Sequence, residues 1–404
     1  MPTEPDTAAA RIARDMSRAA TAWLADLDAE QRVLAWWGPP GGDHEAERRR
    51  WYYTPTDHGG LTFGCQFVWQ QRRAMQLVAS GLSPEGYALV STIIGTENIL
   101  DHVEGFASEF DTRRGRDPSR YYLRVFGDPE GQRPWGWRFG GHHVSVNFLI
   151  VGGEVRSTTP RFFGLDPAVT TLPGGATLDP LRAFQSAGRD LVTSLSADAR
   201  ASAVLLDQAP ADIVMGNRSA LQDGATVMKL HEIFRRRPGD DDLMERMRRG
   251  GAARDAEIGY GFRDHELLSM TLAPKGIRGA DLDAGQKDRL DRLVRAYHDG
   301  LPAGLASSWN VDDLYFAWAG PLDAGANYYR IQGESMLIEW DNSARNGNHA
   351  HSVVRHLSND FGGDALQSAG GAAAPPLDET DTGLLGTSPA GNRRDRPQAS
   401  GRGG

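Results

Sequence analysis

The stretch that decides the fold is WGWRFGGHHVSVNFLIV, residues 135–151. It is rich in aromatic and β-branched residues and contains no proline, which predicts a β-strand. The aromatic segment Tyr121–Phe126 precedes it, and the turn signal GDPEG lies between them at 127–131. We therefore expect one long strand, Trp135–Val151, that ends at Gly152-Gly153 and pairs with Tyr121–Phe126 as a hairpin.

A second pair of expected strands, Asp313–Trp318 and Asn327–Trp340, mirrors the first. The offset is 321 − 129 = 192, taken from Pro321 and Pro129, and it places Arg330 on Arg138, Gly333 on Gly141 and Trp340 on Phe148. Few residues are identical, so coincidence is the alternative to an old duplication. A duplication predicts two related helix-hairpin units, at about residues 84–151 and 276–342, that share one antiparallel sheet with helices packed on it.

The chain as a whole is expected to have an α+β fold. Its 404 residues are 40% hydrophobic and 24% charged, which is ordinary for a globular protein with a sizeable core. We assign residues 1–361 to a single domain. Residues 362–404 are rich in Gly, Ala, Pro and Ser and contain no aromatic residue. Such a segment buries too little apolar surface to offset its chain entropy, so we expect a disordered C-terminal tail.

Charge and cysteine content exclude several classes of protein. The net charge of −9 argues against a nucleic-acid partner, which usually requires a basic face. Cys65 is the only cysteine, so neither an internal disulfide nor a cysteine zinc cage is possible. The N-terminus does not resemble a secretory signal, and no apolar run is long enough for a membrane helix. These features favour a cytoplasmic protein without a membrane partner.

The first candidate site segment is GGHHVSVN, residues 140–147, within the expected strand. Side chains alternate between the two faces of a strand, so His143, Ser145 and Asn147 share one face. His142 then lies at the end of the apolar face. The alternative is an ordinary strand whose polar face is solvated. His, Ser and Asn together are less expected on such a face, and which of the two histidines faces a site stays open.

The second candidate segment runs from Glu339 to His351. Glu339 and Asp341 project from the same strand face, and their repulsion would raise one pKa unless a cation lies between them. His349 and His351 form a His-x-His pair whose imidazoles face the same way and can chelate one metal ion. The alternative is that these residues only shape turns. Against it, five of the 11 histidines lie in or just after the two segments: His142, His143, His349, His351 and His356.

Several further residues could complete a site. Arg138 and Arg330 could bind an anionic substrate group bidentately, although structural salt bridges are the alternative. Trp137 could form the wall of a ligand pocket, with the hydrophobic core as its ordinary location. Ser145 and Asn147 could bond a ligand. Glu97 could be a buried group that supports the site, or it could lie at the surface.

The chain also resembles domain-of-unknown-function family 3500, a set of uncharacterised bacterial and fungal proteins. The resemblance covers about residues 51–364 and departs in the tail and in residues 235–259, which look like a variable inserted helix. It implies no particular chemistry. The matching motifs are FGDPEG, PWGWRFGGHHVSVNF, TPRFFG, APADI, LYFAWAG, YYRIQG, LIEWDN, NHAHSVVR and DFGGD.

We predict a metal-dependent enzyme that acts on a small polar molecule. His349 and His351, with His143 or His142 and with Glu339 or Asp341, would hold one divalent ion of iron, copper, zinc or manganese. The remaining carboxylate would act as a general base or orient a ligand, with Asn147 beside it. Redox chemistry is slightly preferred to hydrolysis. The alternative is a metal-free module that binds or senses a small molecule with the same polar cluster.

Overall fold

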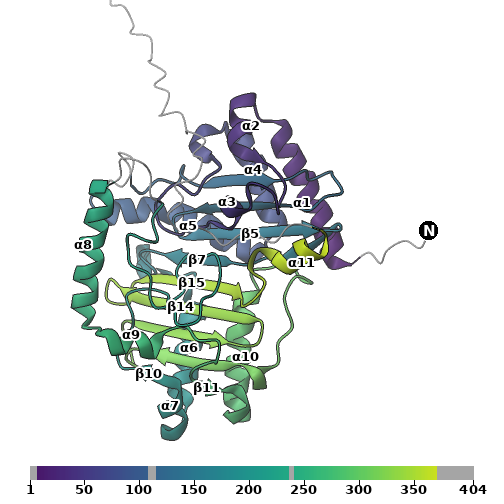
Figure 1. Ribbon diagram of the computed structural model, residues 1–404. Helices are drawn as coiled ribbons and strands as arrows, with labels where there is room; N and C mark the ends of the chain where they lie inside the picture. Colours follow the sequence, from purple (N-terminus) through teal and green to yellow (C-terminus); the bar gives the residue numbers. More distant parts are fainter. Residues whose placement is uncertain (1–6, 108–114, 236–240, 371–404) are drawn as a thin grey trace, which may run out of the picture.

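The computed structural model describes residues 7–107, 115–235 and 241–370, and it confirms an α+β fold. A mixed sheet of 13 strands runs through these residues (Figure 1). Its main path has the order β1-β3-β4-β5-β7-β15-β14-β13-β12-β10. The strands of this path are β1 Trp36–Trp37, β3 Tyr122–Phe126, β4 Trp135–Gly141, β5 Val144–Val151, β7 Arg161–Leu165, β10 Val204–Leu206, β12 Tyr315–Ala319, β13 Asn327–Gln332, β14 Met336–Ala344 and β15 His349–His356.

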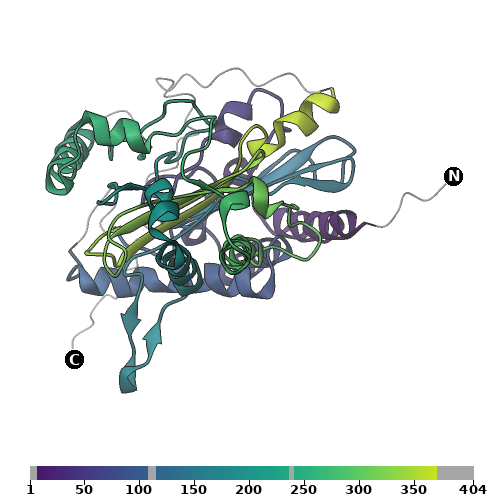
Figure 2. The same ribbon diagram turned by 90° about the horizontal axis from the view of Figure 1, so that it is seen from below.

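Three short strands join the sheet beside this path, and two more form a separate ribbon. β2 (Leu61–Thr62) pairs with β3, β11 (Ile277–Arg278) with β12, and β6 (Glu154–Ser157) with β5. The ribbon of β8 (Thr170–Thr171) and β9 (Thr177–Leu178) projects from the rest of the molecule (Figure 2).

Helices cover one face of the sheet because their apolar stripes pack on the apolar side chains of the strands. Met16 and Trp23 of α1, Leu77 of α4, Leu191 of α6 and Leu290 of α10 belong to one buried cluster with strand residues of both halves of the sheet. The helices are α1 Ala8–Ala25, α2 Ala29–Ala35, α3 Glu45–Arg49, α4 Val68–Ser80, α5 Pro84–Val103, α6 Arg182–Ser194, α7 Ala197–Ala203, α8 Asp241–Ile258, α9 Phe262–Leu268, α10 Ala284–His298 and α11 Gly363–Ser368. None of the described helices is long and apolar enough to cross a membrane.

Largely irregular segments cover the opposite face of the sheet. Residues 51–53 and 213–234 supply apolar side chains that pack there against Phe162 and Val353. The polar side chains on this face are therefore buried: Ser145 is 1% exposed and Glu339 is 0% exposed. A solvated strand face, which was the alternative for the first segment, is not what the structure contains.

The expected single strand Trp135–Val151 is wrong, because the chain reverses at His142-His143. β4 and β5 form a tight hairpin in which Gly141 pairs with Val144. His143 has a φ of 65°, a left-handed conformation that non-glycine residues seldom adopt. Its N–H donates to Tyr53 O at 2.9 Å, and its carbonyl accepts from Gly164 N at 2.8 Å. Tertiary contacts thus hold a turn that lacks the Asn-Gly or Asp-Gly signal of tight hairpins.

The expected strand Asn327–Trp340 is likewise two strands, β13 and β14, joined at residues 333–335. The two halves of the sheet then follow the same order about the β7–β15 pair: β3-β4-β5-β7 on one side and β12-β13-β14-β15 on the other. At their outer edges, β1 and β10 pair in parallel with β3 and β12. An origin of this order by duplication stays a prediction, as does the assignment of residues 1–361 to a single domain.

The expected disorder from residue 362 onward is wrong for the residues that follow it directly. Residues 363–368 form α11, and Leu366 of this helix is 4% exposed. Just before this helix, the buried Phe361 holds the chain in place, because the Phe361 carbonyl accepts a hydrogen bond from the Arg48 guanidinium. Residues 371–404 of the expected tail lie outside the described residues.

Candidate metal centre

Three imidazoles meet where the β4–β5 turn approaches β15. Nε2 of His143 lies 2.9 Å from Nε2 of His349 and 3.3 Å from Nε2 of His351. The separation of 206 residues between His143 and His349 is bridged by the sheet, because β7 pairs with both β5 and β15. The expected convergence of the two histidine segments is therefore what the structure contains.

Local sequence explains how each side chain reaches this point. His349 and His351 are two residues apart on β15, so they project to the same side of the strand. Gly164 of β7 lies beneath them. A Cβ atom at Gly164 would lie 2.9 Å from Cδ2 of His143 and 3.0 Å from Cδ2 of His351, so a side chain here would force the imidazoles aside.

Two carboxylates lie behind the imidazoles. Oδ1 of Asp212 is 2.7 Å from Nδ1 of His351, and its other oxygen accepts from the Tyr53 hydroxyl at 2.8 Å. Oδ2 of Asp166 is 3.5 Å from Nδ1 of His349, and Arg345 Nε donates to this oxygen at 2.9 Å. An ionised carboxylate only accepts hydrogen bonds, so the contact with Asp212 places the proton of His351 on Nδ1 and leaves a lone pair on Nε2. The nearby carboxylate of Asp166 favours the same tautomer of His349.

The Nε2 lone pairs of His349 and His351 therefore converge on His143. A proton on His143 Nε2 could satisfy one of them but not both. Ligands that hold one ion tetrahedrally at about 2.0–2.1 Å lie about 3.3 Å apart, close to the observed separations. The three residues could hold a metal ion, with His143 2% exposed and the His349 side chain 22% exposed.

Burial keeps most of the cluster uncharged. Desolvation lowers the pKa of His143 and His349 well below the usual value, and the neighbouring imidazoles add to the effect. The pKa of His351 is raised despite its desolvation, because Asp212 favours the protonated ring. Neutral imidazole is the form that binds a metal, so the uncharged His143 and His349, together with the two carboxylates beside the cluster, suit a cation better than an anion.

Two adjoining groups extend the cluster. Nδ1 of His142 is 2.6 Å from Oε1 of Glu97 in α5, and the His142 ring stacks on that of His143 with centroids 3.7 Å apart. Burial raises the pKa of Glu97 to about 8. On the other side, ligand atoms of Asp212, Asp341 and His351 lie within 4.8 Å of one another. Burial, followed by the charge of Asp212, raises the pKa of Asp341.

The structure thus brings together some of the residues selected from the sequence. His143, His349 and His351 form one group, His142 forms the adjoining group, and Asp341 lies behind His351. Glu339 has a different environment although it shares a strand face with Asp341. Its carboxylate accepts from Val214 N at 2.7 Å, Met215 N at 3.1 Å and the Tyr328 hydroxyl at 2.8 Å, and so anchors the covering segment to the sheet.

The other selected residues make structural contacts. Asn147 donates to Pro160 O at 2.8 Å and to Ser145 Oγ at 3.3 Å. Arg138 donates to Glu47 and to carbonyls of the segment that covers β4, including His58 O at 2.7 Å. Arg330 donates to Ser269 O, and the Trp137 ring stacks on the Phe148 ring.

Asp166, Asp212 and Tyr53 were not selected from the sequence. Asp212 lies in the APADI motif, and Asp166 follows the RFFG motif by two residues. Both motifs are among those that resemble the family, and this resemblance is the only signal in the sequence that points to Asp166 and Asp212. Glu97, which the sequence placed either in a buried position or at the surface, is buried, with 3% of it exposed.

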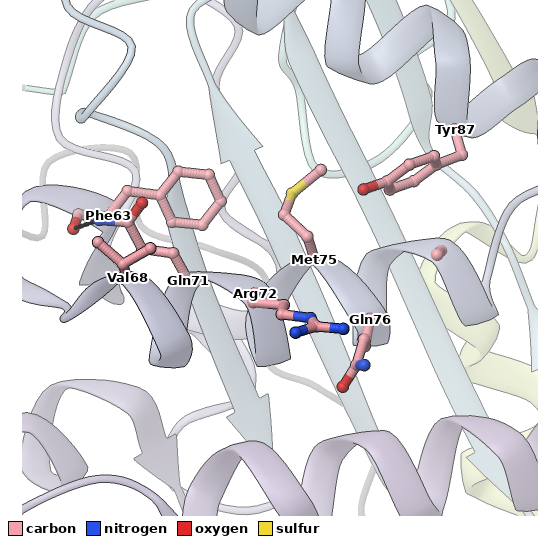
Figure 3. Close-up of a pocket in the computed structure, with 8 residues that line it drawn as sticks. Phe63, Val68, Gln71, Arg72, Met75, Gln76 and Tyr87 are labelled. Carbon is pink, nitrogen blue, oxygen red and sulfur yellow. Dashed lines mark hydrogen bonds between the residues drawn. The ribbon is translucent and has the colours of Figure 1, made fainter.

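A pocket elsewhere on the surface is unrelated to this cluster. It lies along α4, with Met75 between the rings of Phe63 and Tyr87 and with Arg72 and Gln76 beside them (Figure 3). Its lining includes no histidine and no carboxylate. The histidine cluster remains the better candidate for a functional site.

Fold and cluster together define an α+β protein with a buried histidine group that could hold a metal ion. The family described as "Protein of unknown function (DUF3500)" matches residues 9–363, and the chain belongs to it. The match confirms the family resemblance seen in the motifs. No curated protein and no solved structure matches the chain.

Proposed function

We propose that His143, His349 and His351 hold one divalent metal ion and that the protein is a metal-dependent enzyme acting on a small polar molecule. The observation that carries the proposal is the convergence of the three Nε2 atoms, at 2.9 and 3.3 Å, with carboxylates behind two of the rings. Three protein ligands leave a coordination position free, which is the arrangement of catalytic rather than structural zinc sites.

The donor set supports hydrolysis or hydration more than iron oxygenase chemistry. The facial arrangement of non-haem iron enzymes uses two histidines and one carboxylate as direct ligands. Here a third histidine takes the place of that carboxylate, and Asp212 and Asp166 lie behind the imidazoles. A divalent ion at such a site acts as a Lewis acid and lowers the pKa of bound water to about 7. We therefore reverse the slight preference for redox chemistry drawn from the sequence.

The residues of the chain would orient the site and move protons. Asp212 holds the His351 ring, and the Tyr53 hydroxyl in turn holds Asp212. Asp341, whose pKa is raised, can exchange a proton with this pair at a pH nearer neutrality than an ordinary aspartate. The partly exposed His349 marks the side from which a small substrate would enter.

Redox chemistry is the second candidate, because imidazole ligands also suit copper and iron. The specific observation is the hydrogen-bonded chain from the Tyr53 hydroxyl through Asp212 to His351, which connects an oxidisable side chain to the cluster. Identification of the metal separates the two candidates.

Elemental analysis of the protein, purified without a His-tag, tests the proposal. We expect near-stoichiometric zinc, manganese, iron or copper in the wild type and its loss in His349→Ala/His351→Ala. His356→Ala is the matched control, since it removes a histidine of the same strand outside the cluster. His349→Gln, at the most exposed of the three positions, provides a second variant if the double variant does not fold. A protein that takes up none of these ions would favour the metal-free binding module instead.

A further inference from the structure

A second site lies at the other end of β7, where the β13–β14 turn approaches β15 and the end of α10. A cavity of about 180 Å³ opens there. Polar residues from three elements line it, among them Arg161 of β7, His298 of α10 and Ser335 of the turn. Its lining shares no residue with the histidine cluster, so this site is independent of the proposed function.

Arg161 is a buried cation without a carboxylate partner among the described residues. It is 2% exposed, and its Nη2 donates to Tyr297 O at 2.7 Å. Within the described part of the chain, no hydrogen-bond partner meets Nη1. Burial lowers the pKa of Arg161 to about 10, so the guanidinium remains charged at neutral pH. A buried charge with an unused donor is costly unless a ligand compensates it.

His298 supplies a second unused donor beside Arg161. It is 8% exposed, and neither ring nitrogen has a partner among the described residues. Burial, followed by the charge of Arg161, lowers the pKa of His298 to about 4, so the ring is neutral and can offer one N–H. The ring stacks on Trp309, with centroids 4.9 Å apart, and is thereby held in place.

We propose that this cavity binds a small monocarboxylate, with its oxygens on Arg161 Nη1 and the His298 ring and its apolar body against Trp309. Of the two arginines that line the cavity, Arg355 is paired with Asp360 at 2.7 Å, so among the described residues only the charge of Arg161 lacks a carboxylate. This one cation and the neutral donor of His298 match a single negative charge, whereas phosphate would bring close to two. The acidic residues of the lining also disfavour a dianion. Glu334 is exposed at the cavity, and Asp313 is paired with Arg278 at 2.8 Å. Leu301 and Met336 provide further apolar wall.

Isothermal titration of the whole protein with benzoate tests the proposal, with the neutral benzamide and inorganic phosphate as comparison ligands. We expect benzoate to bind at least about tenfold more tightly than either, since a charge-assisted hydrogen bond contributes a factor of about 10 to 100. Arg161→Lys should weaken benzoate binding about tenfold and Arg161→Met should abolish it. His298→Phe, which keeps a ring on Trp309 but removes the donor, should weaken it about threefold to tenfold.

The matched control is Arg330→Lys, because Arg330 is also buried and also donates to a backbone carbonyl, on a different strand. It should leave benzoate binding unchanged. The proposal is overturned by an absence of saturable benzoate binding, by equal binding of benzamide, or by tighter binding of phosphate. Equal losses in the Arg161→Lys and Arg330→Lys variants would also overturn it, because they would report a general loss of folding.

Discussion

Two hairpin turns of the sheet, His142-His143 between β4 and β5 and residues 333–335 between β13 and β14, have equivalent places but opposite chemistry. Each turn offers a carbonyl to the next strand or its extension: His143 O accepts from Gly164 N at 2.8 Å, and Ser335 O accepts from Leu357 N at 3.0 Å. Beyond the first turn lie two histidines of β15 with carboxylates behind them. Beyond the second lie Arg161 and a neutral His298. The same backbone arrangement thus presents imidazole lone pairs at one end and, at the other, donors that have no partner among the described residues.

This difference shows that the order of the strands determines where a site lies, whereas a few side chains determine whether its ligand is positively or negatively charged. Removal of a residue from one turn should therefore affect only the ligand of that turn. The largest expected effect concerns His143, whose Nε2 atom is close to both of its partners. His143→Ala should weaken zinc binding more than about 100-fold, because loss of a direct ligand exceeds the 10- to 100-fold cost of losing a supporting residue.

Competition against a chelating indicator measures this change, and Ser335→Ala at the equivalent turn is the control. Ser335→Ala should bind zinc as the wild type does, and His143→Ala should bind benzoate as the wild type does. Zinc affinity that falls equally in the two variants would show that the turns act on stability alone.

A smaller effect on zinc binding is expected from two carboxylates, Asp212 beside His351 of β15 and Glu339 of β14. Asp212→Asn should weaken zinc binding about 10- to 100-fold, because the amide no longer fixes the proton on His351 Nδ1. Glu339→Gln should leave zinc binding within about twofold. It should instead lower the free energy of unfolding by about 1–3 kcal/mol, because an amide group would then face the Val214 and Met215 N–H donors. Chemical denaturation and zinc titration of both variants separate the two roles, and the reverse assignment of effects would contradict the proposed site.

The smallest effect concerns the pH dependence of stability at the second turn. The pKa of His298 is about 4 in the folded protein, below the usual value of 6.5, because the ring is buried beside Arg161. Below pH 6.5 the unfolded chain takes up a proton that the folded state refuses, so this contribution to stability is lost as the pH falls toward 4. His298→Phe should therefore flatten the decline of Tm between pH 6.5 and 4. An unchanged decline would mean that His298 is already protonated in the folded state.

Part of the fold could be predicted from the sequence because its signals are local. Aromatic and β-branched runs identified both strand regions, and the offset of 192 aligned them in positions that the sheet order now parallels. The reversal at His142-His143 was missed because contacts to Tyr53 and Gly164, distant in sequence, hold it. Helix α11 was missed because its burial comes from contacts with the rest of the fold.

The same division holds for the candidate site. Histidines two residues apart on a strand share a face whatever the rest of the chain does, so His349 and His351 were predictable as a pair. Alternation also placed Asp341 and Glu339 on one face, but it could not tell that only Asp341 lies with His351 and Asp212. Backbone N–H groups of a distant segment engage Glu339, and no local pattern encodes that contact.

The sequence by itself determined the strand regions, the α+β class and the histidine pair, because each follows from the spacing of neighbouring residues. Only the tertiary structure decided that His143 joins that pair and that Asp166 and Asp212 lie behind it. It also decided that Arg161 has no carboxylate partner among the residues that the structure describes. The physical reason is that these relations depend on which segments, some 140 to 200 residues apart, the sheet places side by side.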